Sequence, residues 1–473
     1  MKTAQGKSQP LERCSRREML RLSGLGFGSI ALAGLLQAEG RLAFAEATTS
    51  LQTSPNAKAR NVIFLFMGGG PSQVDTFDPK PLLGKLHGKD VPASIAKDIP
   101  RIARAPLNNL LASPWSFTRY GESGIPVSDL FPHVGQCVDD LCILRSMRHD
   151  SPIHAPAESI ATTGTQLGDR PSLGAWLTYG LGSENRNLPG YLVFTAHSET
   201  LRPPTIGAGF LPARYQGVLV DAEKGIPNLN MPQGHTAASR QAQLKLMGEL
   251  NQRHLERHAG HSELEARIRA YELSFRMQTA APEAFDLAQE TEETKALYGF
   301  DRKETAEYGR QCLLARRLVE RGVRFIQLRS GGWDAHGNIA EEHAKSCLST
   351  DRPIAGLLTD LKRRGLLEET LVIWGGEFGR TPAAQGGSKP GRDHSPSAYT
   401  MWLAGGGVKG GRIIGATDDV GYAAIDRPIH PNDLHATILH ALGIEQLDLY
   451  YLHHNRKEIV TVNGGEVISD VLA

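Results

Sequence analysis

The sequence of 473 residues has little of several things that would place it in a specialised class of protein. Aromatic residues make up 6%, and 52 Lys and Arg residues stand against 51 Asp and Glu residues, so the net charge is +1. Because there is no surplus of basic residues, the composition gives no indication of nucleic-acid binding. Hydrophobic residues at 40% and charged residues at 22% exclude a disordered or fibrous chain.

Cysteine is scarce as well, with five residues and no Cys-x-x-Cys pair. The spacing therefore indicates no zinc ribbon, and pairing of the cysteines into disulfides stays optional. Cys137 and Cys142 lie in an apolar stretch, where core positions are expected.

The sequence near the N-terminus has no apolar run long enough for a stable membrane span. The run over residues 22–36 follows paired arginines at residues 16–17 and precedes Ala-Phe-Ala at residues 43–45. This order of features is typical of a twin-arginine signal peptide, with an amphipathic N-terminal helix as the alternative. It predicts removal of residues 1–45 and export through the twin-arginine machinery to the periplasm or beyond. Residues 46–60 are polar without periodicity and are predicted to form a linker.

Three apolar runs end abruptly in glycines, over residues 61–67, 323–328 and 370–374. A continuous apolar run of this length predicts a buried strand of a parallel sheet. Helical periodicity precedes the second and third runs, over residues 305–321 and 353–367. The alternation predicts βαβ units in a three-layer α/β/α fold with a mostly parallel central sheet.

Residues 165–300 lack the strand pattern. The first part, residues 165–237, is loop-rich and is expected to form a rim around a site. The second part, residues 238–300, is polar with a helical pattern and predicts a helical insertion that covers one side of the sheet. We therefore predict a single domain over residues 61–473 that contains this insertion.

Acidic residues and histidines follow the predicted strands. Ligands of a parallel sheet bind beyond the carboxyl ends of its strands, so we expect these loops to converge on one metal site. Asp, Glu and His together suit one or two ions of zinc, manganese or iron, while oxygen-rich sites also admit magnesium and calcium. The candidate ligands are Asp75, Asp334, His336, Glu377, Asp393 and His394.

Several of these segments resemble known families. The strand and glycine turn at residues 61–70, the run before Glu377, the pair Asp393-His394 and residues 433–443 resemble the alkaline phosphatase superfamily. More closely, essentially the whole chain after the signal resembles the bacterial domain-of-unknown-function 1501 family. The resemblance implies a sulfatase-like fold. The motifs that carry it are Gly69-Gly70-Pro71-Ser72, Asp75-Thr76-Phe77-Asp78-Pro79-Lys80, His154 with Thr163-Gly164, Gly332-Trp333-Asp334-Ala335-His336, Gly376-Glu377-Phe378-Gly379-Arg380-Thr381-Pro382 and Asp393-His394.

The sequence also departs from the hydrolase pattern of the superfamily. Gly68 stands where the phosphatases have a metal-binding Asp, so Asp75 or Asp78 would have to substitute for it. His154 stands at the position of the nucleophile, and Ser151 serves as nucleophile only if the register shifts. The Cys/Ser-x-Pro-x-Arg motif is absent, which argues against an ordinary type I sulfatase.

Three residues keep alternative roles. An imidazole can ligate a metal, attack phosphorus or relay protons, so His154 is a ligand, a contact of the transition state, a nucleophile or a structural residue. Arg380 either clamps an anionic oxygen of the substrate or pairs with a ligand carboxylate. His435 lies in a helical pattern and is expected to be buried, behind the ligands or as one of them.

These patterns together predict an exported metal-dependent hydrolase of phosphate or sulfate esters. Its partner would be an anionic ester, a sulfated or phosphorylated glycan included. Two alternatives stay open: a metal-stabilised, non-catalytic binding protein for sulfated or acidic glycans, and a metal-dependent phosphotransferase or mutase. The last of these needs a covalent intermediate on His154 or Ser151.

Overall fold

The computed structural model describes residue 54 and residues 57–100, 106–195, 205–227, 237–257, 268, 272–273, 276–278 and 281–473. The predicted signal peptide, residues 1–45, lies outside the described residues, and so does most of the predicted linker over residues 46–60. Among the helices of the described part, none combines the length and the apolar character needed to cross a membrane.

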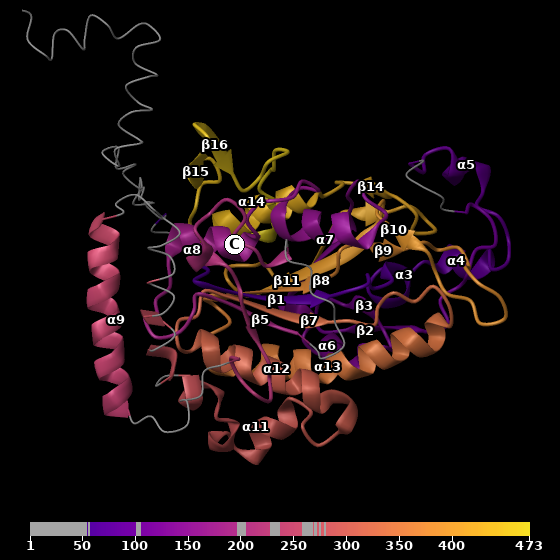
Figure 1. The fold of residues 1–473 in the computed structure, drawn as a ribbon. Coiled ribbons are helices and arrows are strands. Elements are labelled where there is room, and N and C mark those ends of the chain that lie inside the picture. Colours follow the sequence, from indigo (N-terminus) through magenta and orange to yellow (C-terminus); the bar gives the residue numbers. More distant parts are fainter. Residues whose placement is uncertain are drawn as a thin grey trace, which may run out of the picture.

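An eight-stranded sheet forms the centre of the molecule (Figure 1), in the order β12-β4-β11-β8-β1-β7-β5-β6. In this sheet β11 pairs antiparallel with both of its neighbours, and the other strands run parallel to one another. The predicted mostly parallel sheet is therefore confirmed. The strands are β1 (Asn61–Met67), β4 (Leu141–Met147), β5 (Tyr191–Phe194), β6 (Val218–Val220), β7 (Phe325–Ser330), β8 (Thr370–Gly375), β11 (Tyr399–Ala404) and β12 (Arg412–Ile414).

The three strands predicted from apolar runs are neighbours at the centre of the sheet, with β1 between β7 and β8. Every residue of β1 is buried. Successive side chains of a strand point to opposite faces, so a strand covered on both faces needs apolar residues at every position. Residues 63, 65 and 67 accordingly pack into one core cluster, and residues 62, 64 and 66 into the other.

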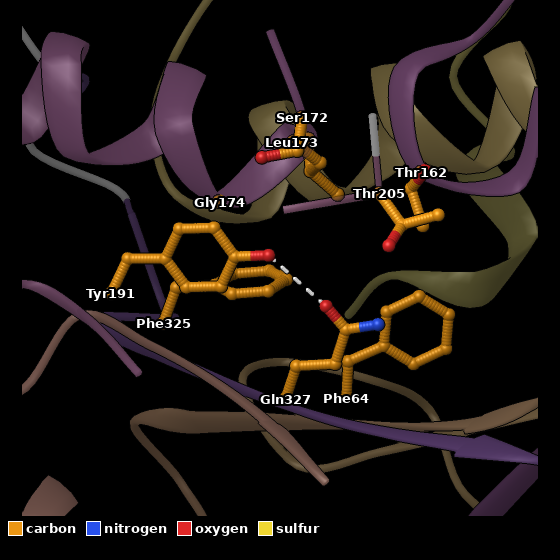
Figure 2. A pocket seen from close by; sticks show the side chains of 9 residues that line it. All are labelled: Phe64, Thr162, Ser172, Leu173, Gly174, Tyr191, Thr205, Phe325 and Gln327. Carbon is orange, nitrogen blue, oxygen red and sulfur yellow. Dashed lines mark hydrogen bonds between the residues drawn. The ribbon is translucent and has the colours of Figure 1, made fainter. Parts of the chain in front are cut away.

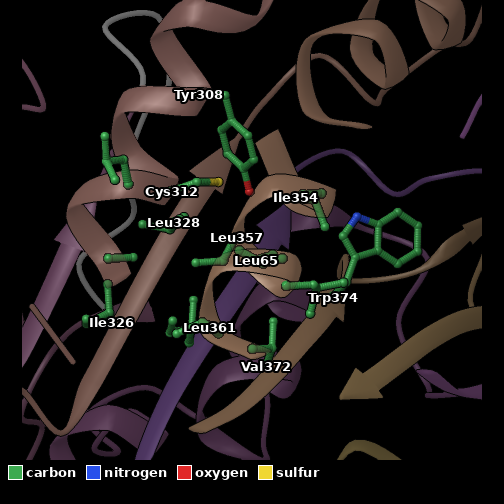
Figure 3. Packing of buried hydrophobic residues seen from close by; sticks show 14 of the residues in the cluster. Leu65, Tyr308, Cys312, Ile326, Leu328, Ile354, Leu357, Leu361, Val372 and Trp374 are labelled. Carbon is green, nitrogen blue, oxygen red and sulfur yellow. The ribbon is translucent and has the colours of Figure 1, made fainter. Parts of the chain in front are cut away.

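Helices cover both faces of the sheet and give three layers (Figure 1). On one face lie α12 (Lys303–Val319) and α13 (Ile339–Arg363), and on the other lie α7 (His154–Thr163), α8 (Leu173–Leu181) and α14 (Pro431–Ala441). Figure 3 shows the first interface, where Ile326 and Val372 of the sheet share a buried cluster with Leu357 and Leu361 of α13.

The prediction for residues 165–237 was wrong in one respect, because this segment contributes α8, β5 and β6 to the main fold. Strands of four and three residues are too short to produce a periodic pattern in the sequence. Residues 237–257 form a helix as predicted, α9 (Ala237–Arg257), but it stands beside the sheet in Figure 1 rather than over one of its faces. Helix α11 (Glu292–Leu297) lies on the far side of α12 and α13 from the sheet.

Short elements fill the connections, and several of them carry the loops discussed below. They are α3 (Gln73–Thr76), α4 (Pro81–Lys85), α5 (Ala93–Ala96), α6 (Pro132–Gly135), β2 (Phe117–Tyr120), β3 (Ile125–Ser128), β9 (Gly379–Arg380), β10 (His394–Ser395), β13 (Ala416–Thr417), β14 (Ala424–Asp426), β15 (Tyr450–His453) and β16 (Arg456–Ile459). Strands β9 and β10 pair with each other and place residue 380 opposite residue 394.

Candidate metal centre

The site begins at the glycine turn after β1. Gly69 and Gly70 have φ angles of 113° and 85°, which side chains of L-amino acids rarely adopt. A Cβ atom on Gly69 would also lie 2.5 Å from the backbone nitrogen of Asp334. Gly69 therefore lets the loop after β1 pack directly against the loop after β7, where Asp334 and His336 lie, and Gly70 does the same against Phe378 after β8.

Four side chains meet at this edge of the sheet. The Nε2 atoms of His336 and His394 are 2.9 Å apart, and they lie 2.9 and 3.1 Å from Oδ1 of Asp334. The Nε2 atom of His154, at the first residue of α7, lies 3.2 Å from Oδ2 of Asp334. One ligand atom from each residue lies within 4.8 Å of all the others, which is the spacing of a metal site. The structure thus brings four of the predicted site residues together.

Each histidine of this cluster is held from behind through its Nδ1 atom. Amide, carbonyl and carboxylate oxygens accept hydrogen bonds, so a proton on each Nδ1 satisfies them and would leave each Nε2 available to bind a metal ion at the centre. Such partners fix both the tautomer and the ring orientation of metal-binding histidines. The pairs are His154 with Oε1 of Glu377 at 2.7 Å, His336 with Oε1 of Gln385 at 2.6 Å and His394 with the carbonyl oxygen of Pro152 at 2.7 Å.

The electrostatics of the cluster also favour a cation. Burial alone would lower the pKa of His154, but the adjacent carboxylates of Asp334 and Glu377 outweigh it and raise the pKa to about 9. Burial would raise the pKa of Asp334, but its bonds to His154, His394 and Arg380 lower it well below the usual range. The carboxylates therefore hold a proton on His154, in a place where a metal ion could supply the positive charge instead.

The donor set fits one divalent ion. The buried Nε2 of His154 has no aligned hydrogen-bond partner among the described residues, as expected for an atom that awaits a ligand. Three imidazole nitrogens and one carboxylate oxygen suit zinc, manganese or iron(II), whereas calcium and magnesium prefer oxygen ligands. In the part of the chain that the structure describes, this is the one such group.

Two predicted ligands lie behind the histidines instead of among them. Both carboxylate oxygens of the buried Glu377 accept hydrogen bonds from the backbone N–H of Gly69, at 2.9 and 3.2 Å, and one of them also holds His154. Oδ1 of Asp393 accepts the backbone N–H of His394 at 2.8 Å and lies 3.8 Å from Nδ1 of His336. Both residues orient and charge the site without joining the four clustered atoms.

Arg380 follows the second of its two predicted roles. Its Nη2 lies 2.6 Å from Oδ1 of Asp334, so it pairs with a candidate ligand carboxylate. The guanidinium is fully buried and also donates to the carbonyl oxygens of Gly69, Gly70 and Arg392. Arg380 therefore joins three loops of the site and does not reach the surface where a substrate would bind.

Asp75 stays outside the cluster, in contrast to its predicted place as a ligand. Its two oxygens lie 2.7 and 3.1 Å from Arg392, and one of them accepts the hydroxyl of Ser72 at 2.6 Å. Asp75 and Arg392 are both fully buried. Asp78, the other candidate, pairs with Lys80 at 3.0 Å and accepts the hydroxyl of Thr417. Both carboxylates stabilise the fold around the turn.

Ser151 makes its hydrogen bonds within its own loop. Its hydroxyl lies 3.3 Å from the backbone nitrogen and oxygen of Ile153, and its backbone N–H donates to Nδ1 of His149. The other nitrogen of His149 donates to the carbonyl oxygen of Glu377. Residues 149–153 thus form a braced loop that positions Pro152 and His154, and Ser151 is a structural part of it.

A separate cavity lies between the sheet and helices α7 and α8 (Figure 2). Tyr191 donates a hydrogen bond to Gln327 in its wall, at 3.0 Å. None of the four clustered residues lines this cavity, so it is distinct from the candidate metal centre. Its lining residues are Phe64, Thr162, Ser172, Leu173, Gly174, Tyr191, Thr205, Phe325 and Gln327.

Gln385 was not predicted from the sequence, and its contact leads to a test. Replacing Gln385 by leucine removes the acceptor behind His336, so we expect zinc affinity to fall about 10- to 100-fold. Glutamate at the same position is a stronger acceptor and should keep or raise the affinity. Calorimetric titration with zinc measures both variants. Equal affinity of the leucine variant and the wild type would contradict this role.

Three buried histidines predict how stability depends on pH. Burial lowers the pKa of His343 to about 3 and those of His149 and His435 to about 4. Because an unfolded histidine titrates near 6.5, the unfolded chain binds more protons below that pH. The free energy of unfolding is therefore highest above pH 6.5 as far as these three histidines are concerned. It decreases as pH falls towards 4, by on the order of 1–3 kcal/mol for each of them. Thermal unfolding between pH 8 and pH 4 checks this, and His435→Gln should reduce the slope.

The chain is similar to one protein family and to several solved structures. The family model described as "Protein of unknown function (DUF1501)" matches residues 59–472. No curated protein matches the chain in sequence. Similar solved structures include PsFucS1 sulfatase from Pseudoalteromonas sp., with 14% identity over 88% of this chain and 70% of that one and a TM-score of 0.35. The C-terminal periplasmic domain of EcEptC from Escherichia coli, in complex with Zn, is 10% identical over 83% of this chain and 85% of that one, with a TM-score of 0.36. Alkaline phosphatase from the Antarctic bacterium TAB5 is 10% identical over 81% of this chain and 98% of that one, with a TM-score of 0.34.

Proposed function

The chain belongs to the DUF1501 family, and we propose that it is a hydrolase of phosphate or sulfate esters that holds one divalent metal ion. The observation that carries the proposal is the convergence of the Nε2 atoms of His154, His336 and His394 on the carboxylate of Asp334. A divalent ion bound there would polarise an ester oxygen and lower the pKa of a coordinated water. Stabilising charge on oxygen in this way is what displacement at phosphorus or sulfur requires.

The cluster is open on one side. The side chains of Asp334 and His336 are 45% and 39% exposed, whereas those of His154 and His394 are 22% and 15% exposed. The buried ring of Phe378 packs against the two less exposed histidines, with its centroid 4.4 Å from that of His394 and 4.9 Å from that of His154. An ester could therefore approach past Asp334 and His336 while the other two histidines stay fixed.

The attacking group in this proposal is a water molecule. The hydroxyl of Ser151, the nucleophile that the sequence offered, bonds to the backbone of its own loop. His154 is held through Nδ1 by Glu377 and directs Nε2 at the cluster, which fits a ligand better than a nucleophile. A transferase or mutase with a covalent intermediate therefore has less support.

Export belongs to the same proposal. It rests on the sequence of residues 1–45, with paired arginines, an apolar run and an Ala-Phe-Ala site in order. The substrate would then be an ester met outside the cytoplasm, such as a sulfated or phosphorylated glycan.

Metal content and ester turnover test the proposed function together. We expect about one zinc, manganese or iron ion per purified chain, and turnover of at least one aryl phosphate or sulfate ester. Chelation should abolish the turnover, and the same metal should restore it. A bound ion with no turnover of any ester would favour the glycan-binding alternative. No bound ion, even after reconstitution, would contradict the proposal.

A further inference from the structure

We propose that the site selects esters with a single negative charge, such as sulfate monoesters and phosphodiesters, over phosphate monoesters, which carry two. This inference rests on the proposed function and concerns the same site. Its basis is the set of charged side chains around the four clustered residues.

Three carboxylates surround the place of the ion. Asp334 belongs to the cluster itself. Oε1 of Glu377 lies 2.7 Å from Nδ1 of His154, and Oδ1 of Asp393 lies 3.8 Å from Nδ1 of His336. The histidines are neutral when they ligate a metal, so a divalent ion balances only two of these three negative charges.

Positive charge at the site comes from one side chain that a ligand cannot reach. Among the described residues, Arg380 is the one Lys or Arg that forms an ion pair with these carboxylates. It is fully buried and donates to backbone carbonyl oxygens of the surrounding loops. The neighbouring Arg392 is also buried and pairs with Asp75. With the ion bound, the total charge of the site is therefore close to zero.

A site of this kind discriminates between anions by their charge. The cost of taking an ion out of water rises steeply with its charge, and among the described residues no solvent-exposed Lys or Arg pairs with the carboxylates of the site to offset a second negative charge. The phosphate of a monoester is largely dianionic at pH 8, whereas a sulfate monoester and a phosphodiester are monoanions. Glu377 and Asp393 also repel the dianion more strongly than the monoanion.

Binding of two matched ions tests the inference without turnover. Phenylphosphonate is a dianion at pH 8, and its monomethyl ester is a monoanion of similar shape. We expect calorimetry on the zinc-loaded full chain to give at least tenfold tighter binding of the monomethyl ester. Equal or tighter binding of the dianion, or no binding of either at millimolar concentration, would overturn the inference.

Turnover distinguishes a sulfate monoester from a phosphodiester as the monoanionic substrate. Aryl sulfate, bis-aryl phosphate and aryl phosphate are compared by kcat/KM, and one of the first two should exceed the third by at least tenfold. Preference for the aryl phosphate would overturn the inference. If none is turned over while the monomethyl ester still binds more tightly, the proposed function fails and the charge selection stands.

Asp393→Asn supplies the control. Asparagine keeps an oxygen to accept the backbone N–H of His394 and removes one negative charge near the ion. We expect the preference for the monoanion to shrink about three- to tenfold, since one charge less repels the dianion. An unchanged preference in a variant with normal zinc content would show that the carboxylates do not select the substrate.

Discussion

Replacing Asp334 by asparagine is expected to lower zinc affinity roughly a thousandfold, about 4 kcal/mol, and to abolish ester turnover with it. Asp334 supplies the only carboxylate among the four clustered residues, and its two oxygens lie next to all three histidines. Asparagine keeps the shape but removes the charge that attracts a divalent ion. Zinc content after dialysis and calorimetric titration measure the loss.

The matched control for this variant is Asp393→Asn. The substitution is the same, but the carboxylate of Asp393 lies behind His336 and His394 instead of in the cluster. We expect its zinc affinity to fall by at most about tenfold, at the low end for a residue that supports ligands, because asparagine still accepts the backbone N–H of His394. If the Asp334 variant keeps stoichiometric zinc, the assignment of the cluster as a metal centre fails.

Replacing Asp75 by asparagine is expected to cost about 3–5 kcal/mol of folding stability. Burial opposes ionisation of Asp75, but the guanidinium of Arg392 and the hydroxyl of Ser72 outweigh it and lower its pKa. The substitution leaves the fully buried Arg392 without its counter-ion. Thermal or denaturant unfolding at pH 7 measures the effect.

Asp98→Asn is the control for the loss of an ion pair. The Nζ atom of Lys97 lies 3.9 Å from Oδ2 of Asp98, and the two side chains are 70% and 68% exposed. Exposed pairs contribute little, so we expect a change within about 0.5 kcal/mol. Similar losses in the two variants would show that the buried pair has no special role around the glycine turn.

Much of the fold could be predicted because burial on both faces leaves a clear pattern in the sequence. Strands β1, β7 and β8 are continuous apolar runs, and α12 and α13 have an apolar helical period. Strands β5 and β6 were missed because four and three residues are too few for a period, and their place in the sheet depends on pairing with β7. Long-range pairing of this kind has no local signal.

The candidate site, like the fold, could be predicted only in part. The order of strands and loops predicts that Asp334, His336 and His394 come together, because parallel strands end at one edge of the sheet. The order of strands and loops does not distinguish a metal ligand from an acidic residue that holds a ligand in place. Glu377 follows a strand just as Asp334 does, but its carboxylate faces Gly69 and the back of His154.

Contacts between residues far apart in the sequence explain why the structure differs from the prediction at Asp75 and Gln385. Asp75 pairs with Arg392, which is 317 positions away in the chain. No local sequence pattern could therefore show that the charge of Asp75 is neutralised by an ion pair. Gln385 supports His336 from a glycine-containing loop with no signature of its own. The tertiary structure alone decides which polar side chain meets which.

The distribution of the clustered residues along the chain has a consequence for biogenesis. His154 begins α7, residues 334 and 336 follow β7, and His394 lies in β10, so no short fragment holds the full set. A metal ion that binds only the assembled cluster stabilises the native state and none of its precursors. In the proposed metalloprotein, ion uptake would therefore follow folding, and a bound ion would mark a molecule whose central sheet has already formed.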